Sequence, residues 1–394
     1  MKIRQIEAAE RPTVSLPVQA YAFESSPAAG EMAQRMRDFQ RYTDENVTLV
    51  AEEDGVAVAA ASAIPMRQNV RGRVYPMAGV ASVASLPLGR RRGHVRALMT
   101  DLLGRMREEG CAVSALYPFR PSFYERFGYV GLPKARTVTF SPADLAGLLR
   151  RELPGEVRWE RSGTGYRGYR DFTIRLLAEC HGFAVLPEYR ATQMRDADDR
   201  WLATAWDGGE MLAAVTYRIA GFGGELQAYD LLTRSPLGRA LLLRFFAGHA
   251  DQVGTVVATV QPGEIPELWE TDLAPVTQAA VSFPRAAAPM ARVLALEPLA
   301  GAPAGPGRVT VEVIGDPFIG GRYLIDGSSG ALEVSRGTGE PEATLTAAGM
   351  SGLIYGVLDP DEVVLRGFGQ VPAEVAARLR LLFPRRVPYV FAHF

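Results

Sequence analysis

The sequence predicts an α+β protein with mixed sheets, divided into three parts. The first third reads as strands and helices in the order β-β-β-α-β-α-β, and the middle third carries a shorter, degenerate copy of part of this order. The last third follows a stretch rich in proline, glycine and alanine at 286–308, and glycines separate its short apolar segments. We therefore expect domains at 1–145, 146–285 and 286–394.

The first third opens with a strand, an Asp54-Gly55 turn and a second strand, all within residues 48–59. Residues 67–73 read as another turn, and residues 74–86 as a long strand that ends before Pro87. Together these segments predict the start of a meander.

A helix is predicted at 94–109, because apolar residues recur there at helical spacing and Gly110 follows as a stop. Residues 111–116 read as a buried parallel strand. Residues 121–130 read as a short helix that leads into a further strand. This order completes the first domain.

A basic loop precedes the predicted helix. It contains Arg90, Arg91, Arg92 and Gly93 and continues into the helix with Arg96. The N-terminus of a helix has unpaired N–H groups and a partial positive charge, so an anion placed there gains hydrogen bonds and dipole energy. The loop therefore predicts a pyrophosphate site, whereas the alternative interpretation is a solvated basic face.

Composition excludes several classes of function. A formal charge of −1 over 394 residues argues against a general nucleic-acid binder. Two cysteines, Cys111 and Cys180, are too few for a disulfide framework, and neither has metal-ligand spacing. The longest apolar run, 56–66, is too short to cross a bilayer. We expect a cytoplasmic protein with no metal, no nucleic-acid partner and no membrane partner.

Three segments carry a family resemblance: RRRGHVRAL at 90–98, FYERFGYV at 123–130 and YVFAHF at 389–394. Together they resemble the enhanced intracellular survival (Eis) family of GNAT acetyltransferases, which acetylate aminoglycosides. The resemblance implies tandem GNAT folds followed by a sterol-carrier-protein-like α+β domain, and it implies a hexamer. The loop fits the family pattern (Gln/Arg)-x-x-Gly-x-(Gly/Ala), except that Val95 replaces the last small residue.

The middle third looks like a degenerate second copy. Pro87-Leu-Gly-Arg90 recurs as Pro236-Leu-Gly-Arg239, and each is followed by a helix and an apolar strand. The second copy lacks the stretch from Arg91 to Arg96, which predicts one CoA site per chain. Chance similarity in a chain rich in arginine and leucine is the alternative explanation.

The resemblance also implies catalytic residues. Tyr124, the first tyrosine of Tyr-x-Arg-Phe-Gly-Tyr, would be the general acid, since a phenol is protonated at neutral pH. The main-chain carboxylate of Phe394 would be the base, acting through water, after burial, or by holding the ammonium. Tyr117 and Tyr129 are the competing tyrosines, expected as core aromatics, and His393 is the alternative base.

Acetyl-CoA, as co-substrate, would be held by residues from three segments. Val83, Ala84 and Ser85 would use backbone groups for the pantetheine, and Phe119 and Arg120 match positions that touch CoA in the family. The phosphates would be held by Arg91, Arg92, Gly93, His94, Val95 and Arg96, although the side chain of His94 is expected only to pack or be solvated. On composition alone, Phe23, Glu24, Asp38 and Phe39 are candidates for the acceptor pocket.

These interpretations together predict an acetyl-CoA-dependent N-acetyltransferase that acts directly on primary amines of aminoglycoside-like polyamines, a small-molecule substrate, as a homo-oligomer. Two alternatives remain open. One is a protein-lysine acetyltransferase, and the other is a non-catalytic CoA- or lipid-binding protein. The C-terminal domain is expected to deliver the chain terminus to the site, although folds of its kind can hold lipid.

Overall fold

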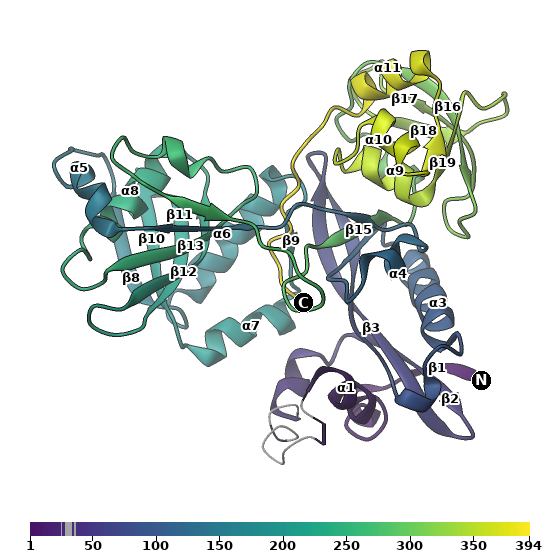
Figure 1. The fold of residues 1–394 in the computed structure, drawn as a ribbon, viewed down its shortest axis with the longest axis horizontal. Coiled ribbons are helices and arrows are strands. Elements are labelled where there is room, and N and C mark those ends of the chain that lie inside the picture. Colours follow the sequence, from purple (N-terminus) through teal and green to yellow (C-terminus); the bar gives the residue numbers. More distant parts are fainter. Residues whose placement is uncertain (25, 28–33, 35–36) are drawn as a thin grey trace.

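The computed structural model describes residues 1–394 except 25, 28–33 and 35–36. Three sheets organise the chain. Figure 1 shows the first sheet in the centre, the second sheet on the left and the third within the C-terminal domain above the first.

The first sheet has the order β1-β2-β3-β4-β5-β15-β6, and β9 pairs with the far end of β3. Its strands are β1 (Lys2–Ile6), β2 (Val47–Glu53), β3 (Val56–Val70), β4 (Arg73–Ser85), β5 (Val113–Leu116), β6 (Val130–Gly131), β9 (Ala184–Val185) and β15 (Met290–Val293). Its helices are α1 (Leu16–Phe23), α3 (His94–Glu108) and α4 (Pro121–Glu125), with a short 3-10 turn, η3 (Pro87–Gly89), before α3. The predicted turn at Asp54-Gly55 and the helix at 94–109 are confirmed, and the helix ends at Glu108. The strand predicted at 111–116 is present from Val113 as β5, and it pairs parallel to β4 as expected.

The predicted turn at 67–73 is wrong in extent. The strand β3 continues to Val70, and only Arg71 and Gly72 form the turn, with φ of 53° and 85°. Gln68 and Asn69 stay in the strand because buried partners satisfy their amides, namely the carbonyls of Gly182 and of Leu177 and Ala178. The sequence does not reveal these partners, which lie more than 100 residues away.

The second sheet has the order β14-β7-β13-β12-β11-β10-β8. Its strands are β7 (Arg136–Phe140), β8 (Glu156–Arg161), β10 (Trp201–Asp207), β11 (Glu210–Ile219), β12 (Glu225–Thr233), β13 (Thr255–Val260) and β14 (Val276–Gln278). The accompanying helices are α5 (Ala146–Leu149), α6 (Tyr166–Glu179), α7 (Glu188–Ala197) and α8 (Pro236–Ala247). The unit β12-α8-β13, in which β13 runs parallel to β12, has the same connection as β4-α3-β5.

The sheets cross the predicted domain boundaries. The strand β7, placed in the first domain by the boundary at 145, belongs to the second sheet, where it pairs with β13 and β14. The strand β15, placed in the third domain by the boundary at 286, lies between β5 and β6 of the first sheet. Both pairings satisfy strand edges through partners distant in sequence, so local composition does not mark them.

The third sheet has the order β18-β17-β16-β19-β20. It consists of β16 (Arg308–Ile314), β17 (Gly321–Asp326), β18 (Glu333–Arg336), β19 (Ala343–Thr346) and β20 (Gly369–Gln370), accompanied by α9 (Ala347–Ile354), α10 (Pro360–Leu365) and α11 (Ala373–Leu382). Apolar segments separated by glycines predict a strand at 331–334 and a helix at 350–357 in this domain. The strand β18 begins two residues later, at Glu333, and the helix α9 begins three residues earlier, at Ala347. The Thr346 side chain accepts a hydrogen bond from the Gly349 N–H, and this cap sets the earlier start of α9.

After α11 the chain leaves the C-terminal domain as an extended tail, residues 384–394. Figure 1 shows it descending between the two other sheets, so that the C-terminus lies near the centre of the molecule. The N–H of Tyr389 donates to the carbonyl of His181, which fixes the middle of the tail to the second domain. No helix within the described residues is both long enough and apolar enough to cross a membrane.

Candidate active site

An unpaired strand edge forms one wall of the candidate site. The strand β4 pairs with β5 only over residues 77–80, whereas it pairs with β3 as far as Ser85. A bulge places Ser82 and Val83 opposite Ala61, and Ser82 has φ of 56°. Residues 81–85 therefore present backbone groups on the side from which β5 has diverged, and Val83, Ala84 and Ser85 lie in this segment.

The basic loop forms the second wall. Gly93 is the N-cap of α3 with φ of 86°, and Arg91 has φ of 60°, so the backbone turns sharply in front of the helix. A Cβ added at Gly93 would meet no atom within 4 Å, which means that the backbone conformation, and not space, favours glycine there. The first N–H groups of α3 face the end of the loop, as an anion site requires.

A cavity of about 670 Å³ joins these two walls. It contains most of the residues expected to hold acetyl-CoA: Val83, Ala84, Ser85, Arg91, Gly93, His94, Val95, Arg96 and Phe119. Arg90 and Arg126 also line it. Sequence reasoning did not select Arg126, although it belongs to the Tyr-x-Arg-Phe-Gly-Tyr motif and could have been found there.

Two of the expected cofactor residues lie outside this cavity. Arg92 is turned back to Glu53, with 2.5 Å between Nη1 and Oε2, and Arg120 is exposed ahead of α4. The side chain of His94 is also turned inward, with Nε2 3.1 Å from Glu53 Oε1 and Nδ1 3.0 Å from the sulfur of Met1. His94 therefore contributes its backbone at the helix N-terminus, while its imidazole packs.

Tyr124 lies on α4, buried among aromatic rings. Its ring centroid is 5.3 Å from that of Phe119, 5.1 Å from Phe123 and 6.1 Å from Tyr129. Burial raises the pKa of Tyr124 above its usual value near 10, so the phenol keeps its proton at neutral pH. Its hydroxyl makes no hydrogen bond to the part of the chain that the structure describes, and it is therefore available as a donor.

The two competing tyrosines have partners. The hydroxyl of Tyr129 is 2.6 Å from the Oγ of Ser114 in the core, whereas the hydroxyl of Tyr117 donates to the carbonyl of Ala392 at 3.1 Å. Tyr129 packs as expected. Tyr117 does more than pack, because it holds the C-terminal tail.

The tail brings the chain terminus to the end of β5. The rings of His393 and Phe394 lie 5.3 and 5.6 Å from that of Tyr117. A Cβ at Gly79 would clash with the sulfur of Met66 and would lie 3.2 Å from the Phe394 ring, so glycine at this point of β4 makes room for both side chains. Phe394 thus lies beside the last paired residues of β4 and β5, where the open edge begins.

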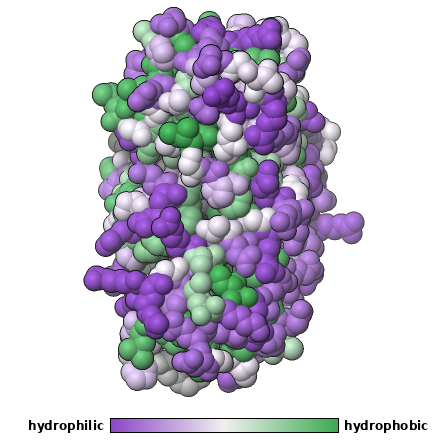
Figure 2. Space-filling model, turned by 90° about the vertical axis from the view of Figure 1, so that its right-hand side faces the viewer, coloured by the Kyte–Doolittle hydropathy of each residue, from purple (hydrophilic) through white to green (hydrophobic). Residues whose placement is uncertain are grey.

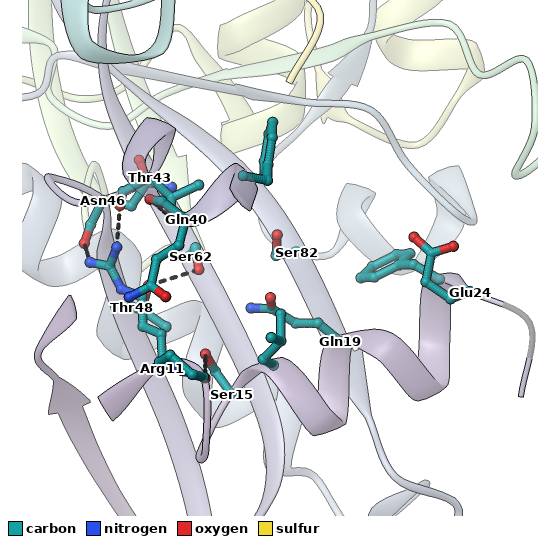
Figure 3. Close-up of a pocket in the computed structure, with 14 residues that line it drawn as sticks. Arg11, Ser15, Gln19, Glu24, Gln40, Thr43, Asn46, Thr48, Ser62 and Ser82 are labelled. Carbon is teal, nitrogen blue, oxygen red and sulfur yellow. Dashed lines mark hydrogen bonds between the residues drawn. The ribbon is translucent and has the colours of Figure 1, made fainter. Parts of the chain in front are cut away.

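A second cavity, of about 530 Å³, lies beside α1 (Figure 3). Phe23, Glu24 and Phe39 line it, as expected for an acceptor pocket, whereas Asp38 does not and instead accepts a hydrogen bond from Gln34. Figure 3 places Ser82 between Arg11 at one end and Glu24 at the other. The guanidinium of Arg11 is held by main-chain carbonyls of 43, 44 and 46, and Glu24 is the one carboxylate among the described residues that line this cavity.

Within the described residues, no three side chains of His, Cys, Asp or Glu come together in a way that could hold a metal ion.

The unit β12-α8-β13 of the second sheet lacks the anion site that the N-terminus of α3 offers in the first. There α8 begins directly at Pro236, and the Ser235 side chain accepts from the Gly238 N–H at 3.1 Å. The helix N-terminus is already capped, which fits a single CoA site per chain.

Comparison with known proteins matches the first third of the chain to an acetyltransferase domain family. Residues 2–131 match the acetyltransferase (GNAT) domain family. A segment of 73 residues is 40% identical to the N-acetyltransferase Eis of Mycobacterium tuberculosis (strain CDC 1551 / Oshkosh) and to that of Mycobacterium bovis (strain BCG / Pasteur 1173P2). This segment spans 18% of this chain and 18% of each relative.

Solved structures share the whole fold. A GCN5-related N-acetyltransferase from Kribbella flavida superimposes with a TM-score of 0.81 at 24% identity, over 100% of this chain and 98% of its own. Eis1 from Mycobacterium abscessus gives a TM-score of 0.79 at 20% identity, over 100% of both chains. At these identities the likeness concerns the fold, which is mixed α/β with multiple sheets.

Proposed function

We propose that this chain, whose residues 2–131 match the GNAT acetyltransferase domain, is an acetyl-CoA-dependent N-acetyltransferase that acts on a primary amine. One observation carries the proposal. A single cavity joins the open edge of β4, the arginine-bearing N-terminus of α3 and Phe119, whose ring meets that of Tyr124 edge to face. The cavity would bind the thioester and the diphosphate, and the proposed acid, Tyr124, lies behind the Phe119 and Phe123 side chains that line it.

Acetyl-CoA supplies an acetyl group as a thioester. The N-terminus of α3 and the side chains of Arg91 and Arg96 would hold its diphosphate, because guanidinium groups and unpaired N–H groups both favour anions. The backbone of Val83 to Ser85 would hold the pantetheine through hydrogen bonds of the strand type. Arg126 extends the positive charge of the same cavity.

Two groups of this chain would handle the protons. The terminal carboxylate of Phe394 orders the attacking ammonium and takes its proton, directly or through water. The amine nitrogen then forms the new bond to the acetyl carbon, and the carbon–sulfur bond breaks. The hydroxyl of Tyr124 gives its proton to the departing thiolate and recovers, through water, the second proton that the nitrogen loses as the amide forms.

The chemical class of the acceptor amine is a separate part of the proposal. The family resemblance favours aminoglycoside-like polyamines, and the cavity beside α1 offers Phe23, Phe39 and Glu24 for such a ligand. A lysine side chain of a protein is the alternative acceptor. Both alternatives use the same chemistry at the nitrogen.

We assign the C-terminal domain, sterol-carrier-like by resemblance, the role of delivering the tail. We also propose a hexamer, which only the family resemblance implies.

Figure 2 shows one face of the molecule, where hydrophobic side chains occur in small groups separated by hydrophilic ones.

The test is release of CoA from acetyl-CoA by the untagged protein, measured with and without a panel of aminoglycosides, simple polyamines and a lysine-containing peptide. Amine-dependent release supports the transferase, and the best acceptor defines its substrate class. If no amine releases CoA, acetyl-CoA binding measured in parallel by calorimetry shows whether the cofactor binds without turnover or does not bind at all. Binding without release for any amine favours the non-catalytic alternative, and absence of binding contradicts the assignment of the cavity.

A further inference from the structure

The second sheet repeats the open edge of the first. The strand β12 pairs with β13 only over residues 225–228 and then continues to Thr233 paired only with β11 on its other side. A bulge places Asp230 and Leu231 opposite Val215, and Asp230 has φ of 55°. Asp230 therefore occupies in β12 the position that Ser82, with φ of 56°, occupies in β4.

The chain's own tail lies against this second open edge. The hydroxyl of Tyr389 donates to Oδ1 of Asp230 at 3.1 Å, and Leu232 packs in the same apolar cluster as Tyr389. Beside this contact lies a cavity of about 320 Å³, which we call the tail pocket. Asp230, Arg190, Arg200, Ala392 and His393 are among its lining residues. The tail pocket thus reaches the residue next to Phe394.

The charges of the tail pocket have both signs. Arg170 is satisfied by the carbonyl of Leu186 and by Glu188. Arg190 is not satisfied in this way: its guanidinium lies 4.2 Å above the ring of Phe39, and its buried Nη1 has no hydrogen-bond partner among the described residues. A guanidinium nitrogen that is buried without a hydrogen-bond partner is costly, and a carboxylate is the preferred bidentate partner of a guanidinium.

Asp230 supplies the opposite charge. Besides the hydroxyl of Tyr389, its surroundings include His393 and Arg200, and the guanidinium of Arg200 lies 4.0 Å from the centroid of the Tyr229 ring. Burial raises the pKa of Asp230, which means that its carboxylate is short of compensating partners. An ammonium group would provide one.

We propose that the tail pocket, in place of the cavity beside α1, binds the acceptor, and that the acceptor is a primary amine that also carries a carboxylate, such as an amino acid or a short peptide, in place of an aminoglycoside-like polyamine. Arg190 faces the carboxylate of this ligand, and Asp230 faces its ammonium. The assignment rests on the proposed N-acetyltransfer. The volume also fits, because about 320 Å³ is near the lower end of roughly 300–1,000 Å³ for ligand pockets.

The test compares matched acceptors. L-lysine is paired with cadaverine, and L-tyrosine with tyramine, so that each pair differs by one carboxylate, and an aminoglycoside is included. For the wild type, kcat/KM is expected to be at least tenfold higher with the acid-bearing member of each pair. Equal or higher kcat/KM for the decarboxylated amines or for the aminoglycoside would overturn the inference.

Variants of the tail pocket test which residue causes the preference for the acid-bearing acceptor. Arg190→Gln should remove the preference within each pair by raising KM for the amino acid alone, whereas Asp230→Asn should raise KM for both members. Arg195→Gln is the control on the same helix, because Arg195 is exposed and pairs with Asp196. A preference that survives Arg190→Gln, in a variant with wild-type acetyl-CoA affinity and melting temperature, refutes the role of Arg190.

A binding measurement separates this inference from the proposed function. Calorimetry with L-lysine and cadaverine, on the wild type and on Arg190→Gln, requires no turnover. Tighter binding of L-lysine that Arg190→Gln abolishes supports the tail pocket even if no amine releases CoA. Equal binding of both probes contradicts it even if transfer occurs.

Discussion

Replacing Tyr124 by phenylalanine should separate chemistry from folding. The hydroxyl of Tyr124 makes no hydrogen bond to the described residues, and its ring is held by aromatic neighbours that phenylalanine would also contact. The free energy of unfolding should therefore change by less than about 1 kcal/mol. Turnover should fall by roughly a hundredfold or more, the range for a general acid, which corresponds to about 2.7 kcal/mol in the barrier.

Tyr129→Phe is the matched control. Ser114 Oγ donates to the carbonyl of Ala78 and leaves its lone pair to the hydroxyl of Tyr129, so this variant loses a buried hydrogen bond. We expect a loss of about 1 kcal/mol or slightly more in unfolding free energy and turnover near that of the wild type. Tyr124→Phe should thus lose turnover and keep its stability, whereas Tyr129→Phe should lose stability and keep its turnover.

The assay is steady-state CoA release at saturating acetyl-CoA and amine, with calorimetric acetyl-CoA affinity and urea unfolding of the same preparations. Because burial raises the pKa of Tyr124 above 10, its proton should remain available at pH 7 to 9, and it should cause no alkaline loss of turnover there. Turnover of Tyr124→Phe within threefold of the wild type would refute the reasoning, as would an equal loss in folded Tyr129→Phe.

Three further predictions follow from particular contacts. Gly93→Ala should weaken acetyl-CoA binding measured by calorimetry and cost roughly 1 kcal/mol of stability, since only its φ of 86° is strained; unchanged affinity would contradict the loop assignment. Two glycines added after Phe394 should abolish CoA release but leave the melting temperature unchanged, and full activity would exclude the terminal carboxylate. Burial lowers the pKa of His181 to about 4, so unfolding free energy should fall by up to about 3 kcal/mol between pH 6.5 and 4; urea titrations of His181→Gln should lack this component.

The features that the sequence predicted correctly are those set by residues close together in the chain. The helix at 94–109 and the basic loop before it follow from periodicity and from glycine placement, and the structure has both. The retained unit β12-α8-β13 follows from a four-residue repeat. These features are local, so a single segment contains their whole cause.

What the sequence did not predict depends on distant partners. The insertion of β15 between β5 and β6 joins residues more than 150 positions apart, and the side chains of Arg92 and His94 both pair with the distant Glu53. Asp230 gave no local signal, because its significance lies in a bulge and in a tail that arrives from residue 389. Pairing across the chain decides each of these positions.

The β3–β4 hairpin tip explains how a degenerate second domain still serves the site. Arg71 donates from its side chain to the carbonyls of Leu353, Ile354 and Pro384, and its backbone N–H donates to Nδ1 of His181. It thereby joins the first domain to the second domain, to the end of α9 and to the first residue of the tail.

Further along, the tail is held by the carbonyl of His181 at Tyr389, by Asp230 at the Tyr389 hydroxyl, and by Tyr117 at Ala392. Two of these three contacts come from the second domain. The second domain, whose helix α8 begins without an anion site, thus presents its open strand edge as the surface against which the tail is positioned.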